Sequence, residues 1–193
     1  AGHFRHRRHS NCGWSKQVSE DRDLLVALLR ARGVDYLTPS DAAADRIVDD
    51  ETLICSLAAH SDSRLRQALI ALFFLNPELN TLVLRLRDRL DGTARQELIA
   101  FYTAAMYLQT MWRIRLSHYV PTIKPLIDYF SAELCLPSPE DEYGKAGLYA
   151  LANWHASQSS LRFNYLSAYQ GVVDLVFASL KLKRSRYELT PAS

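Results

Sequence analysis

The stretch Ala68-Leu-Ile-Ala-Leu-Phe-Phe-Leu75 decides the fold of this chain. It is the longest uninterrupted run of apolar residues in the sequence, and as a helix it would have no polar face. A helix that is apolar on every side is stable only when it is buried. We therefore predict that this segment is the central helix of the N-terminal half. A membrane span needs about 20 apolar residues, so the run predicts no membrane crossing.

Helix signals extend from this run in both directions. The central helix begins at Asp62 or Ser63 and stops at Asn76-Pro77, because proline disfavours helical backbone in the residue before it. Three helices are predicted before it: one from a Ser19 cap to Gly33, a short acidic one over Asp41–Val48, and one opened by Asp50.

The second half of the chain shows the same helical spacing. The predicted elements are a helix from Pro77 to Asp91-Gly92, a long helix over Thr93–Tyr119, a segment opened by Lys124-Pro125, a loop over 136–139, a helix capped by Ser138, a break over 158–160, and a last helix from Leu161 to about Leu182. No stretch shows the sustained alternation of apolar and polar residues that strands require. The predicted fold class is therefore all-α, with eight or nine helices in a single compact domain.

The charges divide the chain of 193 residues into three parts. Residues 1–16 carry a net charge of +4 and no apolar period, which predicts a flexible basic arm rich in His and Arg. Residues 17–182 form the helical domain, and residues 183–193 are predicted to be a basic tail. The whole chain has a net charge of only +2, so the body between the basic ends is acidic. An acidic body argues against nonspecific nucleic-acid binding by the fold, although the ends leave contact with RNA or an acidic partner open.

The cysteines and the chain start indicate the compartment. Cys12, Cys55 and Cys135 form no C-x-x-C pair, so they indicate neither a zinc ribbon nor a disulfide framework. The first residues are polar and basic, unlike a signal peptide. These features predict a cytoplasmic protein.

Metal and cofactor signals are confined to the N-terminal arm. His3, His6, His9 and Cys12 are transition-metal ligand types. Histidine-rich arms bind metal adventitiously, however, so we predict no metal site. The phosphate-binding and nucleotide-binding glycine motifs are absent, and we predict no cofactor.

The segment Arg113-Ile-Arg-Leu-Ser-His118 resembles the R-x4-6-H motif of HEPN domains, which are small all-α proteins and often ribonucleases. The resemblance implies that His118 is the acid and base of RNA cleavage and that Arg113 holds the scissile phosphate. Five residues turn a helix by about 140°, so both side chains could meet only at a bend before Pro121 or across two chains. The other interpretation is a solvated helix end, where a histidine near the C-terminus interacts favourably with the helix dipole.

A second resemblance concerns the start of the central helix. Asp62, Leu65, Arg66, Ala68 and Leu72 are similar to the D-x-x-[VL]-R-x-A pattern of HEAT repeats, in which the Asp caps the helix and the Arg bonds toward a neighbouring loop. The chain contains no second copy, and a solenoid needs about three units. We therefore favour an ordinary helical hairpin with an Asp cap.

Aromatic residues are the enrichment that bears on function. The chain has 10 Tyr, and its Arg residues gather in the same middle region, which is the composition that protein interfaces favour. The predicted interaction residues are Trp112, Arg115, Tyr119 and Tyr107. The predicted function is a non-enzymatic protein–protein interaction module, meaning an adaptor, an assembly subunit or a regulator, that binds a protein partner or self-associates. The HEPN-like ribonuclease is the alternative.

Overall fold

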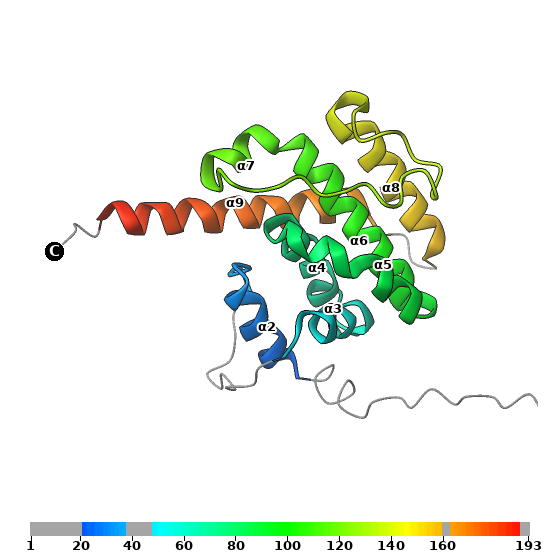
Figure 1. Ribbon diagram of the computed structural model, residues 1–193, viewed down its shortest axis with the longest axis horizontal. Helices are drawn as coiled ribbons and strands as arrows, with labels where there is room; N and C mark the ends of the chain where they lie inside the picture. The colour runs from blue at the N-terminus through cyan, green and yellow to red at the C-terminus, as the bar shows by residue number, and fades with distance from the viewer. Residues whose placement is uncertain (1–20, 38–47, 160–162, 190–193) are drawn as a thin grey trace, which may run out of the picture.

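The computed structural model describes residues 21–37, 48–159 and 163–189. Within these ranges it contains eight α-helices, two short 3-10 helices and no strand, which confirms the all-α prediction. The elements are α2 (Arg22–Ala31), α3 (Asp50–Ala59), α4 (Ser63–Leu75), η1 (Pro77–Leu79), α5 (Asn80–Arg89), α6 (Gly92–Met111), α7 (Arg113–Tyr119), η2 (Asp141–Gly144), α8 (Lys145–Gln158) and α9 (Tyr165–Leu189). Figure 1 shows α9 crossing the molecule, with α7 on one side of it and α2 on the other.

Helix α4 lies at the centre, as the apolar run predicts. Every residue of 68–74 is completely buried, and the helix packs against α2, α3, α6 and α9. The Asp62 carboxylate caps it by accepting a hydrogen bond from the Arg64 backbone N–H at 2.8 Å. Burial on all sides explains why the helix has no polar face.

The predicted helix over Thr93–Tyr119 is interrupted at Trp112. This residue has non-helical backbone angles (φ −105°, ψ 14°) and separates α6 from α7. The bend places α7 over α9, where the Trp112 and Tyr119 rings pack against Phe177. The apolar residues keep their helical spacing across Trp112, so the sequence pattern gives no sign of the bend. Packing of α7 against α9 decides it.

Irregular chain follows α7. The segment opened by Lys124-Pro125 forms turns instead of a helix, and buried Gln109 of α6 holds it in place. The Gln109 Oε1 atom accepts from the Leu126 N–H at 2.6 Å, and its Nε2 atom donates to the Phe74 carbonyl at 3.3 Å. One amide therefore joins this segment to α6 and α4.

Helix α8 begins later than predicted. Ser138 and Asp141 do bond each other, through the Ser138 N–H to the Asp141 carboxylate at 3.1 Å, but they close an isolated turn. The helix starts after Gly144, whose φ of +84° is in the left-handed region. A Cβ there would lie 2.9 Å from the Tyr107 carbonyl oxygen, so glycine is required for α8 to approach α6.

The last helix ends beyond the predicted boundary near Leu182. Helix α9 continues to Leu189, so residues 183–189 of the predicted tail are helical. Two contacts hold this end: Lys183 forms an ion pair with Asp35, and Arg184 donates to His118. No helix breaker interrupts the sequence here, and these contacts stabilise the extension.

Two predicted elements lie outside the described residues, namely the arm over 1–16 and the helix over Asp41–Val48 except its last residue. In the described ranges, no single helix is long and apolar enough to cross a membrane. Only α4 taken together with the η1–α5 helix passes that test, and the two are bent by 105°.

Candidate functional site

The two residues of the ribonuclease prediction face different surroundings. Arg113, the first residue of α7, borders a hollow of about 520 Å³ between α6, α7 and the segment around Leu126. The His118 Nε2 atom contacts the Arg184 Nη1 atom at 2.6 Å on the α9 side. The bend at Trp112 comes before both residues, so α7 still carries them on different faces. The monomer therefore does not bring this pair into one cleft.

Three of the four predicted interaction residues do come together. The Arg115 guanidinium lies 4.1 Å from the centre of the Phe177 ring and 5.6 Å from that of Trp112. The Trp112 and Tyr119 rings lie 5.9 Å and 6.0 Å from Phe177. Phe177 itself is buried, whereas Arg115 is exposed and the Trp112 and Tyr119 rings are half-buried. We call this cluster, with exposed Ile114 and His118 beside it, the α7–α9 face.

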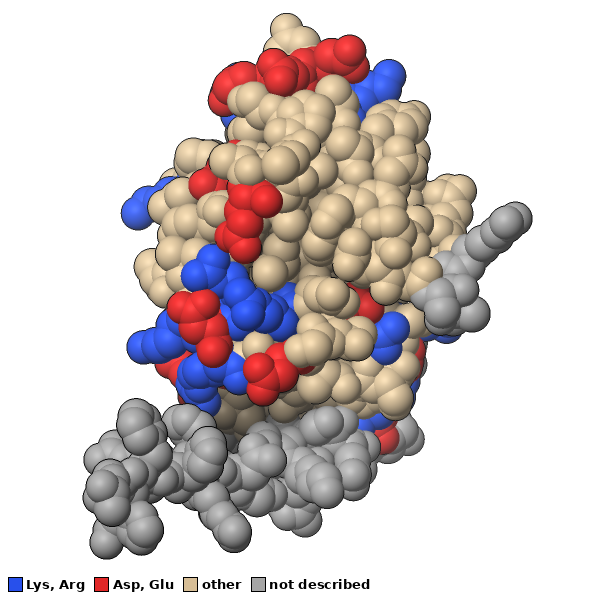
Figure 2. Space-filling model, turned by 90° about the vertical axis from the view of Figure 1, so that its right-hand side faces the viewer, with Lys and Arg blue, Asp and Glu red and all other residues tan. Residues whose placement is uncertain are grey.

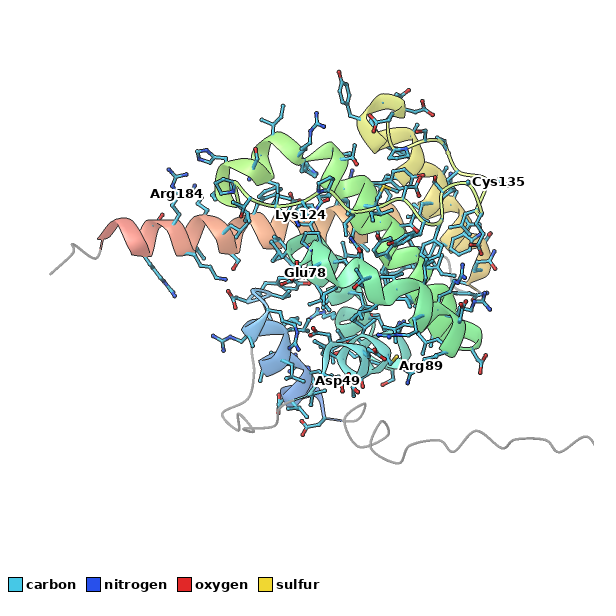
Figure 3. The ribbon with its side chains drawn as sticks, in the orientation of Figure 1. Asp49, Glu78, Arg89, Lys124, Cys135 and Arg184 are labelled. Carbon is cyan, nitrogen blue, oxygen red and sulfur yellow. The ribbon has the colours of Figure 1, made fainter. Side chains whose placement is uncertain are left out.

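The α7–α9 face is basic. Helix α7 contains two arginines and no acid, and residues 180–186 of α9 contain four basic residues and no acid. Among the described residues, neither Arg113 nor Arg115 has a carboxylate within ion-pair distance, whereas Arg85 and Arg89 of α5 are both paired with Glu51. Figure 3 shows Arg184 on the part of α9 that lies beside α7. Basic and acidic side chains are instead interspersed on the face shown in Figure 2.

The fourth predicted interaction residue, Tyr107, is not on the surface, and this prediction is wrong. Its side chain is completely buried, and its hydroxyl donates to the Pro137 carbonyl at 2.6 Å. The ring also fills the space above Gly147, where a Cβ would lie about 2.1 Å from it. Burial of the phenol raises the pKa of Tyr107 to about 12. Tyr107 therefore joins α6, α8 and the loop before α8.

A polar cavity of about 380 Å³ opens where α4 and α6 begin and α8 ends. Glu97 and His155 line it and are almost fully buried, and Arg66 is half-buried beside them. The Arg66 Nε atom lies 3.4 Å from Glu97 Oε1, and the His155 Nε2 atom lies 3.5 Å from Glu97 Oε2. The Glu97 Oε2 and Arg66 Nε atoms have no hydrogen-bond partner among the described residues.

Both ring nitrogens of His155 have a polar neighbour. Burial raises the pKa of Tyr169 well above its ordinary value, so the side chain stays a phenol. Its hydroxyl lies 2.6 Å from His155 Nδ1, so the two groups share a hydrogen bond, and the other ring nitrogen, Nε2, faces Glu97. The imidazole also stacks on Tyr165, with 3.8 Å between ring centres. The chain Tyr169–His155–Glu97–Arg66 thus links α9, α8, α6 and α4.

This buried network was missed by the sequence interpretation, although signals were present. His155 occupies the next helical position after Leu148 and Leu151, where an apolar residue would be expected. Arg66 was noted only through the HEAT-like pattern, and its Nη1 atom does bond the neighbouring loop, at the His60 and Ser61 carbonyls. Polar residues at core positions indicate buried networks, but their partners cannot be read from spacing.

No group of three metal-ligating side chains occurs in the part of the chain that the structure describes. The His3, His6, His9 and Cys12 cluster lies outside that part. Compared with protein-family models, with curated proteins and with solved structures, the chain has no significant match.

Proposed function

We propose that the protein is a non-enzymatic interaction module that binds an acidic segment of a partner protein on the α7–α9 face. The observation that carries the proposal is the position of Arg115, which is exposed, lies over Phe177 and has no carboxylate partner among the described residues. Trp, Tyr and Arg are the residue types that dominate binding energy at protein interfaces. Here one of each surrounds a buried ring.

Charge selects an acidic partner. The α7–α9 face carries Arg115 of α7 and Arg184 of α9, on a chain whose body is otherwise acidic. The Arg115 guanidinium can form a bidentate contact with a carboxylate. An acidic partner therefore gains electrostatic attraction and a preferred position on this face.

Apolar exposure favours a protein over a nucleic acid. The Ile114 side chain is 84% exposed on the outer side of α7, and it lies between the two arginines in the sequence. A phosphate backbone offers no apolar group to cover it, whereas an acidic peptide with an aliphatic or aromatic residue does. We therefore favour a protein segment that combines carboxylates with at least one apolar side chain.

The test compares capture by matched variants of the full chain. Tagged wild-type protein, Arg115→Glu and Arg89→Glu are used to capture proteins from a lysate of the source organism after nuclease treatment. Arg89 is an exposed arginine of α5 on another surface, so its variant controls for the same change of two charge units. We expect one acidic partner that Arg115→Glu loses by tenfold or more and Arg89→Glu retains, with binding that weakens as salt is raised.

Two results contradict the proposal. One is a partner set that Arg115→Glu does not change, and the other is capture that depends entirely on RNA. The second result would direct attention to the ribonuclease alternative. RNA cleavage by the wild type that His118→Ala abolishes would then establish that alternative.

A further inference from the structure

We propose that two copies of this chain pair through α9, on the side of the helix away from α7. This surface is separate from the α7–α9 face and does not depend on it. The residues concerned repeat at alternating spacings of three and four along α9. They are Ala168, Gly171, Leu175, Ala178, Leu182 and Ser185, and we call them the α9 stripe. This is the spacing at which helices pair side by side.

The α9 stripe is not covered by the rest of the described chain. Leu175 is 48% exposed and Leu182 is 61% exposed, which is unusual for leucines on one stripe of a long helix. The N-terminal part of the stripe forms one wall of a groove of about 510 Å³, whose other wall includes Tyr36, Leu37 and Gln67. The C-terminal part lies on the end of α9 that projects from the body in Figure 1. Each copy therefore has both a groove and a projecting helix.

The position of Gly171 is a second observation that supports pairing through the α9 stripe. It lies inside a 25-residue helix, where glycine is destabilising relative to alanine. A Cβ at this position would meet nothing within 4 Å among the described residues, so no contact within that part of the chain requires glycine. Close approach of another chain would require it.

The side chains of the α9 stripe differ in size, and these sizes are complementary to those of a second copy that runs antiparallel. A twofold axis between Leu175 and Ala178 places Leu175 opposite Ala178 of the second copy. The same axis places Leu182 opposite Gly171 of the second copy. Each large side chain then faces a small one, and the projecting Leu182 enters the groove beside Gly171. An isologous contact of this kind closes as a dimer.

The charged residues beside the α9 stripe also favour an antiparallel pair. Asp174 and Lys181 are exposed, lie one heptad apart and flank the same side of the stripe. In the antiparallel pair, Asp174 of each copy is within about 3 Å along the helix axis of Lys181 of the other. Two opposite-charge contacts therefore form, whereas a parallel pair would form neither.

The experiment is sedimentation equilibrium of the full chain from low micromolar to several hundred micromolar protein. We expect a reversible dimer, and we expect Gly171→Gln and Leu182→Gln each to raise its dissociation constant by about tenfold or more. Gln170→Ala, at an exposed position of α9 off the stripe, is the matched control and leaves dimerisation unchanged. Gly171→Gln is also expected to keep or raise the melting temperature of the monomer, because glutamine is the better helix former.

Charge exchange tests the antiparallel geometry. Asp174→Lys and Lys181→Asp each weaken the dimer, and the double variant restores it because the two contacts reform with reversed signs. A chain that stays monomeric at every concentration overturns the inference. A dimer that Gly171→Gln and Leu182→Gln leave unchanged overturns it as well. Arg115→Glu is expected to dimerise like the wild type, which separates this result from that of the proposed partner site.

Discussion

Arginine meets aromatic rings and histidine in two regions of this protein, and the two regions use them differently. In the polar cavity, Arg66 faces the buried carboxylate of Glu97, and His155 stacks on Tyr165. On the α7–α9 face, Arg115 lies over the Phe177 ring and stays exposed. The interior region supplies each charge with an opposite charge, whereas the surface region leaves its positive charge available. Similar residue types therefore stabilise the fold in one place and offer a binding surface in the other.

The largest expected effect tests the interior region. Glu97→Ala leaves Arg66 and His155 beside a vacated space, so we expect it to lower the free energy of unfolding by about 3 kcal/mol. Urea unfolding followed by circular dichroism measures the loss. Glu133→Ala removes an exposed carboxylate that pairs with Arg87, and we expect a loss of less than about 1 kcal/mol. Equal losses in the two variants would contradict the contrast between buried and exposed pairs.

A smaller effect is expected from the hydroxyl of Tyr169. Tyr169→Phe keeps the ring but removes the hydroxyl that bonds His155 Nδ1, which costs about 1–2 kcal/mol because a buried polar atom is left unpaired. Thermal unfolding of Tyr149→Phe provides the control, since Tyr149 is 47% exposed. A Tyr169→Phe protein as stable as the wild type would show that the hydrogen bond does not hold α8 to α9.

Lowering the pH is expected to destabilise the loop at His60 and Ser61, whose carbonyls accept hydrogen bonds from Arg66. His60 is buried, and burial lowers its pKa below the ordinary 6.5 even though Asp62 acts in the opposite direction. Its Nδ1 atom accepts from the Asp62 N–H at 2.9 Å, which needs the neutral imidazole. The unfolded chain takes up this proton at a higher pH than the folded chain does. The contribution of His60 to stability is therefore complete above about pH 6.5 and is lost as the pH falls toward the folded-state pKa.

Unfolding free energies measured between pH 7.5 and about pH 5 check this expectation. His60→Asn should flatten the decline in stability, because the substituted side chain takes up no proton in this range. A wild-type stability that does not fall over this range would contradict the assignment.

The smallest effect on stability is expected at the surface region. Ile114→Ser changes a side chain that is 84% exposed, so we expect the free energy of unfolding to stay within about 0.5 kcal/mol of wild type. Capture of the acidic partner is expected to fall several-fold, because α7 loses its exposed apolar side chain. A variant with unchanged stability and unchanged capture would remove Ile114 from the interface.

The fold class followed from local patterns. Apolar spacing, the cap at Asp62, and the breaks at Gly33 and Asn76-Pro77 act within a few residues, and the structure confirms the helices that they bound. The first of these helices is capped by Asp21, two residues after the predicted Ser19. The bend at Trp112 and the extension of α9 to Leu189 were not predicted, because both depend on contacts between segments far apart in the chain. The same limit applies to Tyr107, whose burial depends on two glycines of η2 and α8.

The sequence by itself determined that this is a helical protein and that the apolar segment 68–75 belongs to its core. It also determined that positive charge is concentrated near the two ends of the sequence. Those properties follow from composition and from periodicity along one helix. Only the tertiary structure decided which aromatic residues are exposed and that Glu97, His155 and Arg66 meet in one cavity. It also decided that the described residues leave Leu175 and Leu182 of α9 exposed. Each of these depends on how helices distant in sequence pack together, and spacing along the chain carries no record of that packing.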